Sequence, residues 1–244
     1  EIQDLSYQLY ARRFGEDSAA ILPALQRRAR WLHRLGLFGQ ERYVWNQAID
    51  VIENEYGEDD LRLIGPLNGL AGTYLYDVER AVSNRGEWAL RRALEIAENH
   101  PESTPALVAD SLIDSGNYHT RRGEAQRARR DYRRAWDLLS GDESLVAIRD
   151  QTFGQPVKIR YATAPAYADE ETNPIVNPVF RGRKFDRGVV VANFTVNVRG
   201  RAEDIRVLES QPPGLMDAEV KRAVRRMVFR PRFVDGQPVA TPDQ

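Results

Sequence analysis

Apolar residues recur at intervals of three and four along the first 140 positions, a spacing typical of amphipathic helices. Proline, glycine and charged clusters interrupt this period at distances that suit pairs of helices joined by turns. In the stretch 112–139, Gly123 separates two helical segments, and Tyr132 and Ala135 lie on one face of the second. Gly116 lies in the first segment, so we expect the two helices to approach closely there, with larger side chains filling the gaps.

Two earlier stretches, 25–49 and 67–96, repeat this arrangement. The equivalent alanines of the three copies, Ala48, Ala93 and Ala135, stand 45 and 42 residues apart. The arrangement resembles tetratricopeptide repeats (TPRs), whose helix-pair unit has about 34 residues. The resemblance covers roughly residues 20–140 and follows a leading helix within 1–17. The first domain, 1–141, is therefore expected to be a TPR-like α-solenoid.

The TPR resemblance implies a concave groove, lined by the first helix of each pair, where members of the family bind ligands. The side chains that lie off the packing face of these helices would line it: Gln26, Arg30, His33, Arg34, Asn68, Asn117, Thr120 and Arg121. Arginine and asparagine donors can hold a peptide carboxylate or acidic side chains through charge-assisted hydrogen bonds. The alternative is a solvated helix face, and the sequence leaves both open. The arginine-rich run 127–134 lies on a second helix and is expected to face outward.

The helical period disappears beyond the first domain. Prolines punctuate a stretch with little pattern, at positions 156, 165, 174 and 178. Alternating apolar residues at 157, 159 and 161 indicate one short strand, and an extended segment is expected over 162–187. Residues 142–187 are therefore expected to be a linker with a short strand.

From Gly188 onward the apolar period becomes two. One set of alternating residues is apolar throughout and is expected to face a helix: Val190, Ala192, Phe194, Val196 and Val198. Gly200 supplies a turn into a second strand, which gives an antiparallel hairpin. An amphipathic helix is predicted over 216–228, and Pro231 ends it. A turn at Asp235-Gly236 then reverses an extended segment.

This succession closely resembles the C-terminal domain of TonB-type proteins over about 50 residues. The positions that carry the resemblance are Gly188, Phe194, Gly200, Phe229, Pro231, Asp235 and Gly236. It implies a compact α+β unit over 188–244, with one helix on an antiparallel sheet, in the Gram-negative periplasm. Phe229 would anchor the end of the helix on the sheet. TonB itself pairs a strand with the TonB box of outer-membrane transporters, which is strand addition to a sheet edge.

Three features set this chain apart from a TonB transducer. Tyr167 is followed by Ala168, whereas the family has Tyr-Pro ahead of the first strand. A helical repeat stands where a transducer has a membrane helix and a long proline-rich spacer. The family usually has a final strand after the turn at Gly236; if the protein continues beyond Gln244, the sheet formed by this sequence lacks an edge strand, and the exposed edge could pair with another chain. Because the sequence starts at Glu1 without Met, we expect that a signal peptide or an N-terminal anchor has been removed.

The residue composition excludes several kinds of metal and cofactor site. The chain has no cysteine, which excludes disulfides and thiolate metal sites, and its three histidines, His33, His100 and His119, are not at ligand spacing. The acidic runs 57–60 and 169–172 lack the alternating ligands of a calcium loop, and no phosphate-binding loop occurs. No apolar run reaches the roughly 18 residues of a membrane span. We therefore expect no metal, no cofactor and no membrane span in this chain.

Charge is distributed unevenly along the chain. Residues 1–150 carry a net charge of −5 and residues 151–244 a net charge of +4, so we expect either that the two parts attract each other electrostatically or that one of them meets an acidic partner. The basic stretch 221–232 contains a single aromatic residue, Phe229, and no series of aromatic residues interleaved for base stacking, which argues against nucleic acid.

The sequence thus predicts a non-enzymatic periplasmic adaptor or scaffold that binds a protein or peptide, with an acidic or carboxylate group favoured for the groove. The first alternative is a component of energy transduction that meets an outer-membrane transporter or another envelope protein. An enzyme is the second alternative, and the acidic runs are its only support.

Overall fold

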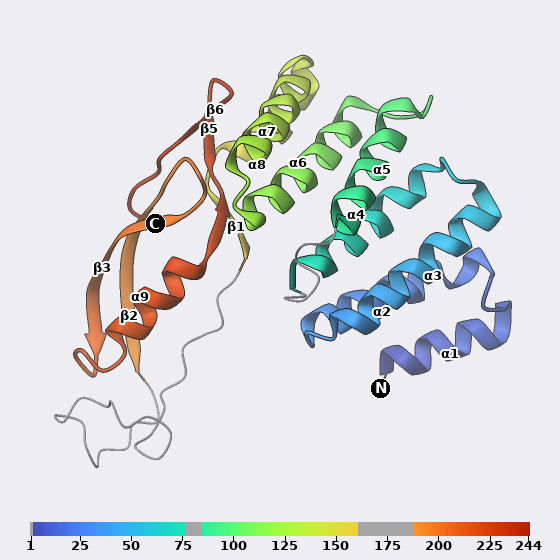
Figure 1. The fold of residues 1–244 in the computed structure, drawn as a ribbon, viewed down its shortest axis with the longest axis horizontal. Coiled ribbons are helices and arrows are strands. Elements are labelled where there is room, and N and C mark those ends of the chain that lie inside the picture. The colour runs from blue at the N-terminus through green and yellow to red at the C-terminus, as the bar shows by residue number, and fades with distance from the viewer. Residues whose placement is uncertain (1, 77–83, 161–187) are drawn as a thin grey trace, which may run out of the picture. The chain divides into compact units, whose positions relative to one another are not determined.

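The computed structural model describes residues 2–76, 84–160 and 188–244. The chain divides into two compact units, Glu1–Val146 and Ala147–Gln244. The described part of the first unit is helical, and the second combines helices with short antiparallel strands (Figure 1). The expected fold class, mostly α followed by a small antiparallel α+β region, is therefore confirmed at this level.

The helical unit is a succession of helices joined by turns and short 3₁₀ helices. The α-helices are α1 (Ile2–Phe14), α2 (Leu22–Arg34), α3 (Phe38–Tyr56), α4 (Ile64–Thr73), α5 (Arg85–Asn99), α6 (Pro105–Arg122) and α7 (Ala125–Ser140). The 3₁₀ helices are η1 (Ala19–Ile21), η2 (Leu61–Leu63), η3 (Tyr74–Tyr76) and η4 (Glu143–Leu145). Helices α2 and α3, α4 and α5, and α6 and α7 pack as neighbours, as do α3 with α4 and α5 with α6. The unit is thus an array of packed helix pairs preceded by α1.

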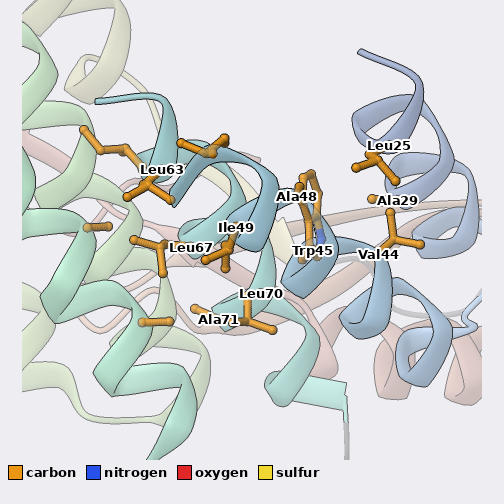
Figure 2. Close-up of a cluster of buried hydrophobic side chains, with 14 of the residues drawn as sticks. Leu25, Ala29, Val44, Trp45, Ala48, Ile49, Leu63, Leu67, Leu70 and Ala71 are labelled. Atoms are coloured by element: carbon orange, nitrogen blue, oxygen red, sulfur yellow. The ribbon is translucent and has the colours of Figure 1, made fainter. Parts of the chain in front are cut away.

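Small residues lie where these helices meet. Ala29 of α2, Ala48 of α3 and Ala71 of α4 are at most 1% exposed, and Figure 2 shows them among larger apolar side chains of the same helices. Ala93 and Ala135, the equivalent residues farther along the chain, are fully buried as well. An alanine occupies little volume, so the helix axes can approach closely while leucine, valine and tryptophan fill the space around it. The prediction that small residues mark the close approaches is confirmed.

The α6–α7 hairpin contains another close approach between two helices. Gly116 of α6 lies directly beneath the ring of Tyr132 of α7: a Cβ at Gly116 would stand 2.6 Å from Tyr132 Cδ1. The Tyr132 hydroxyl donates to Asn117 Oδ1 at 2.9 Å and lies 3.1 Å from the hydroxyl oxygen of Thr120. Thr120 is buried, so its predicted place off the packing face is wrong: its hydroxyl is used inside the hairpin, where it also donates to the Gly116 carbonyl.

Charged side chains close the turn of this hairpin. Gly123 has a left-handed φ of 82° and ends α6, as its lack of a side chain permits. Just after it, Glu124 lies 2.7 Å from Nδ1 of the buried His119 and accepts from Arg122 Nε at 2.8 Å. Burial by itself would raise the pKa of Glu124, but the hydrogen bonds from His119 and Arg122 outweigh it and hold that pKa below its usual range. The ionised carboxylate therefore stabilises the turn.

The second unit consists of two helices and short strands. The helices are α8 (Val146–Phe153) and α9 (Asp217–Arg226); the strands are β1 (Val157–Arg160), β2 (Val189–Val196), β3 (Ala202–Gln211), β4 (Val228–Arg230), β5 (Arg232–Val234) and β6 (Gln237–Val239). The antiparallel pairs are β1 with β4, β2 with β3, and β5 with β6. An isolated bridge between Arg201 and Val228 connects the β2–β3 hairpin to β4.

One face of the β2–β3 hairpin packs against α9. Val196, Ala202, Val224 and Phe229 form a buried cluster, and further apolar residues pack around it: Phe194, Ile205, Val220 and Met227. The predicted inward set of β2 is confirmed except at its end, because β2 stops at Val196 and Val198 is exposed in the turn that follows. The opposite face of the hairpin carries the exposed Val189 and Val191.

Part of the expected linker, 142–187, forms regular structure: the short strand expected there is present as β1 (Val157–Arg160), whereas helix α8 was not expected. Helix α8 occupies part of this stretch, and its one buried residue, Phe153, packs its ring 5.0 Å from that of Phe233 of β5. The Arg230 guanidinium lies over the Phe153 ring at 5.6 Å. Strand β1 pairs with β4, so both elements belong to the C-terminal unit. The remainder of the expected linker, 161–187, lies outside the described residues.

The helix predicted over 216–228 is also shorter than expected. It ends at Arg226, Met227 is extended with ψ 148°, and Val228 begins β4. Val228 is fully buried and pairs with Arg160 of β1. The backbone partner on β1, which lies almost 70 positions upstream, favours a strand over another turn of helix.

Candidate functional site

The edge of β2 that faces away from β3 is a candidate for strand pairing. The C-terminal residues lie along part of it: Val196 and Thr241 exchange backbone hydrogen bonds of 2.9 and 2.8 Å, and Phe194 and Gln244 exchange bonds of 3.2 and 3.0 Å. Asp243 has a φ of 56° and forms a bulge between these two pairs, with its carboxylate accepting from Asn193 Nδ2 at 3.0 Å. Residues 241–244 therefore cover this edge at Phe194 and Val196.

The other half of this edge, at Val190 and Ala192, lies beyond the segment that residues 241–244 cover. In an antiparallel ladder the backbone groups of alternate residues point to the same side, so those of Val190 and Ala192 point where Phe194 and Val196 do. Within the described residues, no strand pairs with Val190 or Ala192 on that side. A strand that continued the line of residues 241–244 would meet donors and acceptors already in register.

The residues of the TonB-like pattern form the frame behind this edge. Phe229 donates its backbone N–H to the Gly200 carbonyl at 2.9 Å, and its ring lies 5.6 Å from that of Phe194. These three residues are thus brought together at the junction of hairpin, helix and β4. The other four stand apart from the junction. Gly188 precedes β2 and lies opposite the Gln211 carbonyl. Pro231 is buried between β4 and β5. Asp235 and Gly236 both have positive φ and form the turn between β5 and β6.

The helical unit brings two of the predicted groove residues together through an aromatic side chain. Tyr76 of η3 lies with its ring 5.5 Å from that of His33 of α2, and the Arg121 guanidinium of α6 lies over it at 4.4 Å. Phe38 stacks on Tyr76 with ring centroids 4.0 Å apart and planes 7° from parallel. We call His33, Phe38, Tyr76 and Arg121 the first-helix cluster. Sequence reasoning missed Phe38 and Tyr76, because both lie at helix ends outside the repeated pattern.

Hydrogen bonds fix the base of this cluster. The buried Glu41 carboxylate lies 3.0 Å from His33 Nδ1 and accepts from Trp45 Nε1 at 3.0 Å. A buried carboxylate needs such donors, and together they orient the imidazole beside Tyr76.

The remaining predicted groove residues differ in their surroundings. Arg30 and Arg34 of α2 are exposed, and Gln26 is half-buried. Asn68 of α4 donates to Asp114 of α6 at 2.7 Å. Asn117 and Thr120 are engaged by Tyr132, as described above. His33 and Arg121 therefore both contact Tyr76, and Arg30 and Arg34 are exposed on the surface. Thr120 is buried within the α6–α7 hairpin.

Two features bear on other classes of function. Across the described residues, no group of three or more histidine, aspartate or glutamate side chains is placed to hold a metal ion. None of the helices in that part of the chain combines the length and apolar character needed to span a membrane.

Comparison with known proteins adds a family for the C-terminal unit. Residues 183–242 match the family described as Gram-negative bacterial TonB protein C-terminal. Protein TonB of Pseudomonas aeruginosa is 38% identical over 68 residues, which make up 28% of this chain and 20% of that protein. The chain thus spans about a fifth of the length of this curated relative.

Among solved structures, the crystal structure of BtubC (BKLC) from P. vanneervenii aligns with a TM-score of 0.49 at 20% identity. The alignment covers 57% of this chain and 54% of that chain. The family match and the TonB relative agree with the hairpin, helix and turn described above. Residues 183–242 are therefore similar to the C-terminal domain of TonB proteins, and the hairpin, helix and turn described above lie within the matched region.

Proposed function

We propose that the chain is a non-enzymatic adaptor of the periplasm, which binds one protein partner through its TonB domain and a second through its helical unit. The observation that supports the proposal most directly is the edge of β2, on which no strand of the described residues pairs with Val190 or Ala192 on the side away from β3. Backbone groups on an edge bind any extended segment of matching length, and the flanking side chains select among sequences.

The partner of the TonB domain would add a strand beside Val190 and Ala192. Its backbone would take up the hydrogen-bonding groups of these two residues, next to the place that residues 241–244 occupy on the same edge. Val190 and Ala192 also carry the inward side chains of β2, so the helix-covered face would stay unchanged on binding.

A proline at position 192 tests this site. Ala192→Pro removes the backbone N–H of residue 192, which points away from β3. The hydrogen bonds between β2 and β3 keep their donors and acceptors. Val191→Thr is the matched control, because it changes an exposed side chain of the same strand and keeps every backbone donor. The whole chain would be cross-linked in a periplasmic extract of a Gram-negative bacterium, and the captured proteins identified by mass spectrometry.

We expect the parent chain and Val191→Thr to capture the same envelope proteins, and Ala192→Pro to lose those bound through the TonB domain. Equal capture by all three would refute strand addition at this edge. Capture of nothing above background by the parent chain would refute the adaptor itself.

The helical unit would bind its partner through a TPR-like groove, an assignment that rests on the repeat pattern and on the first-helix cluster. Arg121, with its guanidinium over Tyr76, and the exposed Arg30 and Arg34 favour an acidic or carboxylate-bearing peptide.

Replacing Arg30 and Arg34 by glutamate should abolish the capture of those partners that Ala192→Pro still captures. The matched control is Arg130→Glu on α7, where the arginine is 74% exposed. Equal losses in both variants would indicate a nonspecific charge effect and contradict the groove.

Energy transduction to an outer-membrane transporter is the second candidate, favoured by the family of residues 183–242. It requires that loss of the gene impair TonB-dependent uptake. A deletion strain with unchanged uptake of such substrates would exclude this function and leave the adaptor proposal standing.

A further inference from the structure

A hollow lined mainly by residues of α5 shares no residue with the surfaces discussed so far. Its volume is about 740 Å³, and its lining includes Trp88, Arg91, Glu95 and Ile96 of α5, together with Asp59 from the segment between α3 and η2. Trp88 is 49% exposed, although tryptophan is a residue that folding usually covers. A large indole left open in the wall of a hollow is typical of a binding hot spot.

The charges around this hollow leave an excess of carboxylate. Arg92 is neutralised within the chain, since it pairs with Glu53 and donates to the Glu58 carbonyl. Arg91 and Glu95 approach only to 4.0 Å, and both side chains are about two thirds exposed. Asp59 has no ion-pair partner among the described residues. Arg91 thus balances one of the two lining carboxylates, and the other remains.

The end of α5 adds to this negative potential. Asn99, His100 and Pro101, at the C-terminus of the helix, also line the hollow. The last carbonyls of a helix carry about half a negative charge, which a lysine or arginine in the final turn commonly offsets. Helix α5 has no basic residue in its last turn. A cation supplied from outside would complete this end of the helix.

The indole itself suits a cation. The Arg92 guanidinium already lies 5.8 Å from the Trp88 ring, so the ring accepts a cation within the chain. Tryptophan provides the most favourable aromatic face for such contacts.

A second hollow on the other side of Trp88 and Arg91, of about 690 Å³, offers a comparison. Its lining pairs Arg127 with Glu87 at 2.9 Å and Arg122 with Glu124 at 2.8 Å. Its carboxylates are thus already matched by arginines of the chain, whereas those of the first hollow are matched only in part. Charge complementarity therefore favours the first hollow as the site for a cation.

We propose that the hollow on α5 binds an arginine or lysine side chain of a protein partner, which lies over the indole of Trp88 and pairs with Asp59 and Glu95. The flexible and exposed Arg91 turns away to solvent when the partner's cation enters. The lining of this surface shares no residue with the first-helix cluster, and its occupant has the opposite charge to the ligand proposed for the groove.

N-acetyl-arginine amide is a suitable probe, and N-acetyl-citrulline amide is its uncharged analogue of nearly equal shape. The intact chain, labelled with ¹⁵N, would be titrated with each at constant ionic strength while the indole N–H signals are followed by NMR. Trp88→Phe assigns the Trp88 signal among the four tryptophans. Asp59→Asn with Glu95→Gln removes the two carboxylates, and Asp17→Asn with Glu55→Gln removes two exposed carboxylates elsewhere as a matched control.

We expect the arginine amide to shift the Trp88 signal saturably and the citrulline amide to bind at least about fivefold more weakly, as the loss of two exposed ion pairs implies. The Asp59/Glu95 variant should weaken arginine binding by a similar factor, and the Asp17/Glu55 variant should not. Equal binding of citrulline and arginine, or a saturable shift with N-acetyl-glutamate amide instead, would overturn the proposal. A Trp88 signal that none of the probes moves would overturn it as well.

Discussion

Replacing Gly116 by alanine tests whether close helix approach holds the array together. The new Cβ would lie 2.6 Å from Tyr132 Cδ1, about 1 Å inside an ordinary contact. Tyr132 is 1% exposed and is held by its hydroxyl, so the ring cannot move away without loosening its hydrogen bond to Asn117. Overpacking of this kind costs about 1–3 kcal/mol, and a weakened buried hydrogen bond adds about 1 kcal/mol.

Helix propensity works in the opposite direction, because alanine in mid-helix is favoured over glycine by about 1 kcal/mol. The net expectation for Gly116→Ala is a loss of about 1–3 kcal/mol in the free energy of unfolding of the helical unit. Urea unfolding followed by circular dichroism at 222 nm measures this loss, since most of the described helix lies in that unit.

Gly39→Ala is the matched control. Gly39 also lies in a helix, α3, but its added Cβ would meet nothing within 4 Å, so this change should be neutral or stabilising. A Tyr132→Ala background should remove most of the cost of Gly116→Ala, because the clashing ring is gone. Similar stabilities for Gly116→Ala and Gly39→Ala would refute the packing argument.

Two further predictions concern the hairpin turn and the C-terminal unit. Because the folded pKa of Glu124 lies below its usual range, its stabilising effect is present above that range and disappears as the pH falls through the folded pKa. Glu124→Gln should therefore cost about 1–2 kcal/mol at pH 7 and progressively less as the pH is lowered through the folded pKa, as urea unfolding over a series of pH values measures; a deficit independent of pH would contradict this. Phe153→Ala removes a fully buried ring beside Phe233 and should cost the C-terminal unit about 3–5 kcal/mol, seen as lost amide-exchange protection in β4 and β5. Unchanged protection would show that α8 is not part of that core.

Much of the helical unit and of the β2–β3 hairpin could be predicted because local pattern and tertiary packing agree there. The small residue at 116 and the aromatic residue at 132 already mark a close helix approach in the sequence. The inward set of β2 follows from strict alternation up to Val196. These features depend on periodicity, which the sequence displays directly.

Other features depend on partners that are distant in sequence. Helix α8 has eight residues and a single buried side chain, too few to produce a period, and the strand at Val228 is decided by its pairing with Arg160. Tyr76 joins α2 to α6 only after the array has folded, and nothing near it in the sequence indicates that role. The same holds for the hollow on α5, since Asp59 lies 29 positions from Trp88.

The pairing of β1 with β4 has a consequence for where this TonB domain can be cut. A fragment that began at residue 183, where the family match starts, would lose the strand beside β4 and the ring of Phe153. It would then present β4 as a second uncovered edge and open an apolar surface around Phe233. Such a fragment would be prone to associate with other chains through the edge of β4 that pairs with β1 in the longer chain. The folding unit of this domain is therefore longer than the region by which its family is recognised, and an isolated domain should begin no later than α8.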